Sequence, residues 1–171
     1  IFSELLEFLG RIVNCGFSQQ MTLPTMGLDH YLPISRLFFG GKSIEARHPL
    51  GSKYAGIVSI KEYRPSTHAG MFDGFMQLPF EMIMSQSFSF IDRMIAISSM
   101  QLQQRRLVQS EDVAVSQIGE IDQALDSAMS GEFAFGNHHC TILCIEDSLK
   151  SLESALSMAV VEMANVGINA V

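Results

Sequence analysis

The chain has 171 residues, with 18 acidic side chains against 11 Lys and Arg, and a net charge of −7. This length suffices for one domain with a substantial core, and the acidic balance argues against a nucleic-acid groove. Three cysteines, Cys15, Cys140 and Cys144, are odd in number and irregularly spaced, which favours a reducing cytoplasm over a disulfide scaffold. The sequence contains no run of about 18 apolar residues, so it predicts no membrane-spanning helix.

The composition predicts more apolar surface than a core needs. Charged residues make up 17% of the chain, while Phe and Met number 12 and 11. Exposed Met and Phe side chains are typical of partner contacts. For any single Phe or Met, an equally good explanation is that it fills the core of a chain without Trp. The one basic cluster, Arg105-Arg106, has no interleaved aromatic residues.

The first half of the chain predicts one helix followed by loops and strands. Residues 3–15 carry apolar side chains at helical spacing and reach Gly16, where a helix would end. Residues 17–51 are rich in Pro and Gly and should hold loops and short strands. The strands are expected at 36–39, 43–47 and 54–62. The apolar residues of the helix are Leu5, Leu6, Phe8, Leu9, Ile12 and Val13.

A short helix and a half-buried strand are expected next. Residues 68–77 could form a helix with Met71, Phe72, Phe75 and Met76 on one side, although two glycines weaken it. Residues 82–90 alternate, so one face should be apolar and the other largely hydroxyl. None of these serines is expected to be catalytic, because no G-x-S-x-G elbow surrounds them.

The long segment 92–129 predicts helix throughout. One continuous helix would measure about 57 Å at 1.5 Å per residue, longer than a domain of this size is wide. Two helices meeting near Ser110 are therefore favoured, with Ser110-Glu111-Asp112 as a helix start. A single helix remains the alternative.

The last third predicts a central strand and an amphipathic helix. Residues 138–145 are continuously apolar, as in a strand covered on both faces. Ser148 should cap a helix that ends at Gly167. The fold class is thus α+β or α/β, a mixed sheet packed with helices. The apolar stripe of the last helix is Leu149, Leu152, Leu156, Val160, Met163 and Val166.

A set of short motifs, in order over residues 31–167, carries a family resemblance. The motifs are Tyr31-Leu32-Pro33, Arg36-Leu37-Phe38-Phe39-Gly40, Tyr54-Ala55-Gly56, Ile60-Lys61-Glu62-Tyr63, Pro79-Phe80-Glu81, Ser85-Gln86-Ser87-Phe88, Ser116-Gln117-Ile118, Ala124-Leu125-Asp126, Ser130-Gly131 and Phe135-Gly136-Asn137-His138-His139. On these motifs, the chain resembles the amino-terminal domain of the VirB/TrbE/CagE ATPases of type IV secretion (conjugal transfer) systems.

The resemblance implies a motor whose ATP and Mg²⁺ bind in a carboxy-terminal domain with a phosphate loop. That loop needs G-x-x-x-x-G-K-[ST] followed directly by a helix. The near match here, Gly41-Lys42-Ser43, has Arg36 at the first glycine position and the strand-like residues 44–47 behind it. A turn at Gly40-Gly41 between two strands is the better interpretation. We therefore expect no ATP binding through this segment and no cofactor in this chain.

The chain is expected to be a fragment of such an ATPase, because it begins at Ile1 without a methionine and is too short for the whole motor. Residues 1–50 would form a loop-rich lead-in and residues 51–171 the sheet-and-helix body. The ATPase domain would lie outside residues 1–171.

No catalytic, cofactor-binding or metal-binding residue is predicted. His138, Cys140 and Cys144 share one strand face, but the two cysteine Cα atoms would be roughly 13 Å apart, too far for one zinc ion. His139 and Cys140 would point to opposite faces and could not share a proton. The matching positions Tyr63, Pro79, Phe88, Gly136 and His138 should be structural.

Two functional hypotheses remain. The first is a non-catalytic docking and assembly domain of a secretion ATPase, cytoplasmic and peripheral at the bacterial inner membrane. By resemblance, its partners would be inner-membrane subunits of the system and further copies of the ATPase, with no direct nucleic-acid contact. The second is a free-standing α/β enzyme with an unrecognised active site, which would need a polar cluster converging in a pocket.

Overall fold

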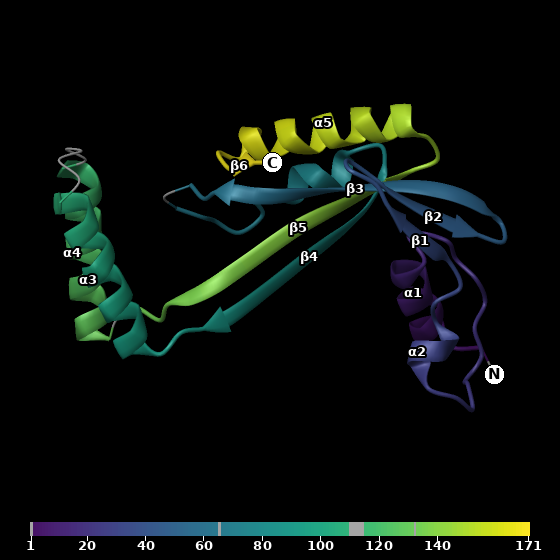
Figure 1. The fold of residues 1–171 in the computed structure, drawn as a ribbon, viewed down its shortest axis with the longest axis horizontal. Coiled ribbons are helices and arrows are strands. Elements are labelled where there is room, and N and C mark those ends of the chain that lie inside the picture. The colour runs from purple at the N-terminus through teal and green to yellow at the C-terminus, as the bar shows by residue number, and fades with distance from the viewer. Residues whose placement is uncertain (1, 65, 110–114, 132) are drawn as a thin grey trace. The chain divides into compact units, whose positions relative to one another are not determined.

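The computed structural model describes residues 2–64, 66–109, 115–131 and 133–171. The sheet order is β1-β2-β3-β5-β4, and β6 pairs with β3. Four strand pairings are antiparallel: β1 with β2, β2 with β3, β3 with β5, and β3 with β6. The predicted sheet packed with helices is therefore confirmed, and the fold is α+β (Figure 1). The elements are α1 (Glu4–Val13), α2 (Leu28–Tyr31), β1 (Arg36–Phe39), β2 (Ile44–His48), β3 (Gly51–Glu62), the 3-10 helix η1 (Asp73–Gln77), β4 (Glu81–Phe90), α3 (Arg93–Gln109), α4 (Val115–Ser130), β5 (Gly136–Glu146), α5 (Leu149–Asn165) and β6 (Asn169–Ala170).

The chain divides into two compact units. The first unit comprises Ile1–Ser85 and Cys140–Val171, and the second comprises Gln86–His139. Strands β4 and β5 run from one unit into the other.

The main core of the first unit lies between α5 and the sheet. Figure 1 shows α5 lying along one face of β3. Helix α5 begins where Ser148 accepts a hydrogen bond from the Ser151 N–H at 3.2 Å and ends before Gly167, whose φ is +77°, as expected. The core residues are Val58, Met71, Phe75, Ile142, Cys144, Leu152, Ala155, Ala159, Met163 and Ile168.

The predicted apolar stripe of α5 is wrong at two residues. Leu149 and Val160 are exposed, while Ala155 and Ala159 are buried. Small residues occupy the centre of the buried face because the helix approaches the strands closely there. In the segment expected as a short helix, Phe75 is buried, but Met76, which was expected on the same side, is 88% exposed.

The opposite sheet face carries a second, smaller core. It comprises Cys15, Ala46, Ala55 and Ile145, with Ile83 among the partly buried residues packed on it. Strand β5 lies between β3 and β4 and contributes Ile142 to the main core and Ile145 to this one. The prediction of a central strand covered on both faces is confirmed.

Asn14, directly after α1, organises the amino-terminal segment. Its side chain is 2% exposed. Its Nδ2 donates to the carbonyls of Gly10 and Leu32 at 2.8 Å, and its Oδ1 accepts from the N–H groups of Ile34 and Ser35 at 2.8 Å. One buried amide therefore joins the end of α1 to the chain that leads into β1.

Helices α3 and α4 pack against each other in the second unit. Arg93 near the start of α3 donates to the Met129 carbonyl near the end of α4, and Gln104 donates to Asp122. The helices are therefore antiparallel, and the prediction of two helices is confirmed. The junction expected near Ser110 lies outside the described residues.

The expected half-buried face of β4 exists only in its first half. Met82, Ile83 and Met84 pack on the two cores, whereas residues 85–90 are exposed. Phe90 is 78% exposed and contacts Phe88 edge to face, with 5.0 Å between ring centroids. The alternating pattern correctly predicted a strand. Among the described residues, however, no core cluster includes this half of β4.

Candidate functional site

A shallow groove lies between α1 and the start of β4 in the first unit. Its volume is about 270 Å³. Helix α1 provides one wall and β4 the other, and the side chains of both walls are largely apolar. The lining residues are Phe8, Arg11, Ile12, Gly16, Glu81, Met82 and Ile83.

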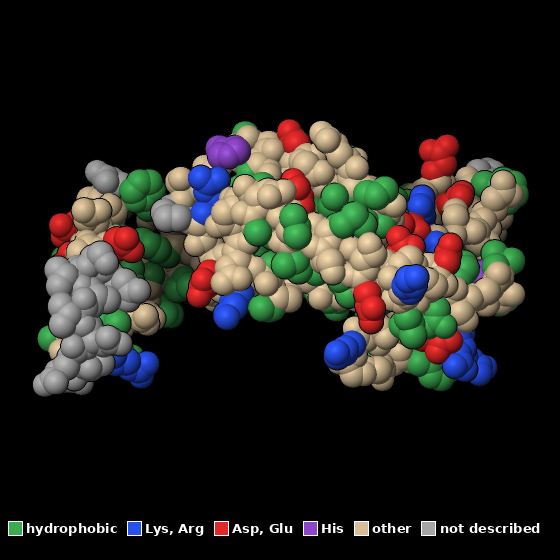
Figure 2. Space-filling view, turned by 90° about the horizontal axis from the view of Figure 1, so that it is seen from above, with side chains coloured by type: hydrophobic (Ala, Val, Ile, Leu, Met, Phe, Trp, Pro, Cys, Tyr) green, Lys and Arg blue, Asp and Glu red, His purple; other side chains and the backbone are tan. Residues whose placement is uncertain are grey.

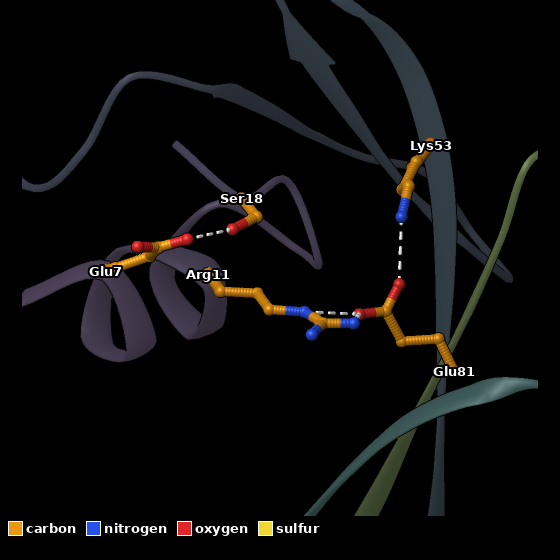
Figure 3. Close-up of polar contacts among 5 residues, drawn as sticks. All are labelled: Glu7, Arg11, Ser18, Lys53 and Glu81. Atoms are coloured by element: carbon orange, nitrogen blue, oxygen red, sulfur yellow. Dashed lines mark hydrogen bonds and ion pairs between the residues drawn. The ribbon is translucent and has the colours of Figure 1, made fainter. Parts of the chain in front are cut away.

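The polar part of this groove is a Glu81 cluster, formed by Arg11, Lys53 and Glu81. Glu81 Oε1 accepts hydrogen bonds from Arg11 Nε at 2.9 Å and Nη2 at 2.6 Å, and Oε2 accepts one from Lys53 Nζ at 2.8 Å (Figure 3). The cluster joins α1, β3 and β4, three elements far apart in the sequence.

The electrostatics of the cluster keep Glu81 ionised. Burial alone would raise the pKa of Glu81, but the hydrogen bonds and charges of Lys53 and Arg11 outweigh it, so the pKa lies below its ordinary value. Lys53 also lies over the Phe17 ring at 5.3 Å from its centroid. Phe17 in turn stacks on His48, with ring centroids 4.5 Å apart.

The turn after α1 lets the backbone approach Glu81. Gly16 has a φ of +84°, and a Cβ there would lie 2.4 Å from Glu81 Oε2. One turn before Arg11 on α1, Glu7 accepts a hydrogen bond from Ser18 Oγ at 2.9 Å (Figure 3). This hydrogen bond ties the segment after the turn back to α1.

This arrangement suits anchoring rather than catalysis. Both oxygens of Glu81 are occupied by cations, and a carboxylate with a lowered pKa holds no proton to donate near neutral pH. The nearby thiol of Cys15 is buried, and burial raises its pKa, so it is not an activated nucleophile. The Glu81 cluster therefore fixes α1 against the sheet.

Helix α1 is apolar on two sides. Its inward side chains, Leu6 and Leu9, pack with Met21 and Leu32. Its outward side chains, Leu5 and Phe8, are 66% and 60% exposed, and Ile12 is 36% exposed. Figure 2 shows one face of the molecule, on which hydrophobic side chains reach the surface between single charged groups. An apolar helix side anchored in this way is a typical interaction surface.

The two cysteines of β5 are buried side chains. Cys140 and Cys144 are both free and buried, and burial raises the pKa of Cys144 to about 11. His139 is exposed while Cys140 is buried, as the alternation of a strand requires. Within the described ranges no three His, Cys, Asp or Glu side chains gather as a metal site would need.

The segment that partly matched a phosphate loop is a hairpin turn. Gly40 N–H donates to the Ser43 carbonyl at 2.8 Å, and Phe39 pairs with Ile44. Strand β2 follows directly, as predicted, so the backbone here does not have the helix start that a phosphate loop uses.

Sequence reasoning missed the roles of Arg11, Lys53 and Glu81. The available signal was a lone carboxylate at the start of the Met- and Ile-rich strand that follows Pro79-Phe80. Its partners could not be named, because they lie 70 and 28 residues away.

Within the part of the chain that the structure describes, no helix combines the length and apolar character needed to cross a bilayer.

The chain belongs to the CagE, TrbE, VirB family, described as a component of the type IV transporter system, whose profile matches residues 1–171. Among its relatives, the type IV secretion system protein virB4 of Bartonella henselae is 35% identical over 167 residues, covering 98% of this chain and 21% of that protein. Protein virB4 of Rhizobium radiobacter is 32% identical with the same coverage. The virB4 protein of Brucella melitensis is 31% identical over 157 residues, covering 92% of this chain and 19% of that protein. The chain thus spans about a fifth of the length of these relatives, and the resemblance seen in the short motifs is confirmed.

Proposed function

We propose that this chain is a docking and assembly domain of a type IV secretion ATPase and does not itself hydrolyse ATP. The observation that carries the proposal is the outward apolar side of α1, Leu5, Phe8 and Ile12, which the Glu81 cluster holds in place. Leaving large apolar side chains in water on an anchored helix is unfavourable unless a partner covers them.

The proposed partners are short inner-membrane subunits of the same secretion system and neighbouring copies of the ATPase. Binding to such subunits would place the domain on the cytoplasmic side of the inner membrane, as a peripheral protein. ATP and Mg²⁺ would bind elsewhere in the longer parent protein. The hairpin at Gly40–Ser43 and the small share of its relatives that this chain covers support that division.

The test uses the full-length ATPase co-expressed with the membrane subunits. Leu5→Ser and Phe8→Ser together remove apolar area from the outward side of α1 but leave the inward residues Leu6 and Leu9 intact. We expect this double variant to leave the membrane fraction. The matched control is Leu23→Ser with Met26→Ser, because both residues are exposed but neither lies on α1.

The control variant should sediment with membranes like the unchanged protein. If the α1 variant sediments equally well while its circular dichroism spectrum is unchanged, docking does not occur through α1 and the proposal is wrong.

A further inference from the structure

Strand β1 is an edge of the sheet in the first unit. It stands at one end of the strand order, where its neighbour is β2. The hydrogen bond from the Gly40 N–H to the Ser43 carbonyl begins the ladder between these two strands. Because alternate residues of an antiparallel strand bond to its partner, the backbone of Phe38 bonds to β2. The N–H and C=O groups of Leu37 and Phe39 therefore point away from β2, toward the free edge.

This edge lacks the usual protection against strand addition. Among the described residues, the backbone groups of Leu37 and Phe39 form no hydrogen bond with another element. Sheet edges are commonly protected by Pro, by a bulge or by inward-pointing charges. Strand β1 contains no Pro, and its register with β2 is unbroken from Arg36 to Phe39. Its outward backbone groups can thus pair with another extended chain.

The side chains of β1 are apolar and exposed. Leu37 and Phe38 are exposed, and Phe39 is 76% exposed. The Phe38 ring is held in place by Arg47, whose guanidinium lies 4.3 Å from the ring centroid. Arg47 is itself fixed by Glu45, which accepts a hydrogen bond from its Nε at 2.8 Å. The apolar edge is therefore ordered before any partner binds.

A shallow groove of about 260 Å³ lies beside this edge. It is bounded by the β1–β2 hairpin, by β3 and by the first residue of α5. An added strand would place alternate side chains on this face of the sheet, where the groove can receive one of them. The lining residues are Phe38, Phe39, Gly40, Ser43, Glu45, Tyr54 and Leu149.

The charge of the hairpin indicates what kind of chain would pair with it. Arg36 at the start of β1 and Lys42 in the turn are exposed, and neither forms an ion pair among the described residues. The edge is therefore basic at both ends, in a chain whose net charge is −7. Pairing two copies of β1 would bring these like charges together, whereas acidic residues in an added strand would be attracted.

We propose that β1 binds an extended segment of a partner protein, in which acidic residues flank alternating apolar ones, by adding it to the sheet as a further strand. The backbone of Leu37 and Phe39 supplies the hydrogen bonds, the groove receives an apolar side chain, and Arg36 and Lys42 attract the acids. This peptide site goes beyond the proposed function, because it uses β1 and not α1. A failure here leaves docking through α1 standing.

The test measures binding of a short fluorescent peptide, with Asp at both ends and alternating Val and Thr between them, by fluorescence anisotropy. The full-length ATPase and the 171-residue chain are measured side by side. Leu37→Pro removes an outward N–H but no hydrogen bond to β2, and it should weaken binding by about tenfold or more. Leu37→Val is the matched control, because it keeps the N–H, and it should bind within about twofold of the unchanged chain.

A charge exchange tests the acidic part of the proposal. Arg36→Glu with Lys42→Glu should weaken binding of this peptide and strengthen binding of a peptide with Lys at both ends. Arg105→Glu with Arg106→Glu is the matched control, since it makes the same change in charge on exposed residues of the second unit. It should leave the affinity unchanged. High salt should weaken the binding of each charged peptide to its preferred protein.

A peptide whose central amides are all N-methylated tests the backbone part without altering the protein, so it remains decisive if Leu37→Pro fails to fold. This peptide should not bind. The proposal is wrong if the N-methylated peptide binds as well as the original, or if the unchanged proteins bind neither. Binding to the 171-residue chain but not to the full-length ATPase would also overturn it, because a segment of the parent protein would then cover β1.

Discussion

Gly56 lies directly beneath Leu156. A Cβ on Gly56 would come within 2.8 Å of Leu156 Cδ1, so the strand β3 and the helix α5 approach each other where β3 has no side chain. Gly56 belongs to the Tyr54-Ala55-Gly56 motif that carried the family resemblance. The motif is explained by packing, because this strand position must be small for α5 to cover the sheet.

Gly56→Ala should therefore destabilise the domain, by about 1–3 kcal/mol if α5 cannot shift. Leu156→Ala should relieve the crowding, so the double variant should be less destabilised than the sum of the two single changes. Urea unfolding of the four proteins measures this coupling. If the two single changes in unfolding free energy add up to that of the double variant, the contact between Gly56 and Leu156 does not determine how α5 packs.

Leu152→Ala should cost about 2–5 kcal/mol of unfolding free energy, because Leu152 is fully buried and its truncation leaves a cavity. Leu149→Ala is the matched control, since the same change on the same helix removes an exposed side chain. It should change stability by less than about 0.5 kcal/mol. Equal losses from the two substitutions, measured by chemical denaturation, would contradict the observed orientation of α5.

Asn14→Ala should cost about 3 kcal/mol, because it leaves buried carbonyl and N–H groups of the α1 segment without partners. Asn137→Ala, at an exposed position, is the control and should be nearly neutral. Hydrogen exchange gives the local readout: the amides of Ile34 and Ser35 should lose protection. Retained protection at both amides would mean that the Asn14 side chain is not what holds this segment.

The chain alone should not release phosphate from Mg-ATP above the buffer rate. Its nearest match to a phosphate loop is a turn between β1 and β2. Lys42→Ala should leave this background rate unchanged. Turnover that persists through repeated purification and disappears in the Lys42 variant would show that the hairpin binds nucleotide after all.

Local signals predicted the elements, and distant contacts decided the rest. Ser148 and Gly167 gave the ends of α5 correctly, because capping depends on residues within one turn. The sequence did not reveal that Val160 faces solvent while Ala159 is buried, because that depends on how closely the sheet approaches. The Glu81 cluster was equally hidden, since it joins residues from three separate elements.

Glu81 should make the stability of the first unit depend on pH. Its pKa is lowered in the folded protein from the ordinary value of 4.5, so its ionised form stabilises the fold. This contribution is fully present above the unfolded pKa and is lost as the pH falls through the lower folded pKa. At neutral pH, Glu81→Gln should therefore be less stable than the unchanged chain.

As the pH falls below about 4, the stability difference between the two proteins should shrink, because the unchanged chain then becomes protonated at Glu81 as well. Glu4→Gln is the matched control, since Glu4 is an exposed acid in the first turn of α1 and should change stability little at any pH. Urea unfolding at several pH values measures all three proteins. A difference between Glu81→Gln and the unchanged chain that stays constant down to acid pH would show that Arg11 and Lys53 do not stabilise the ionised carboxylate.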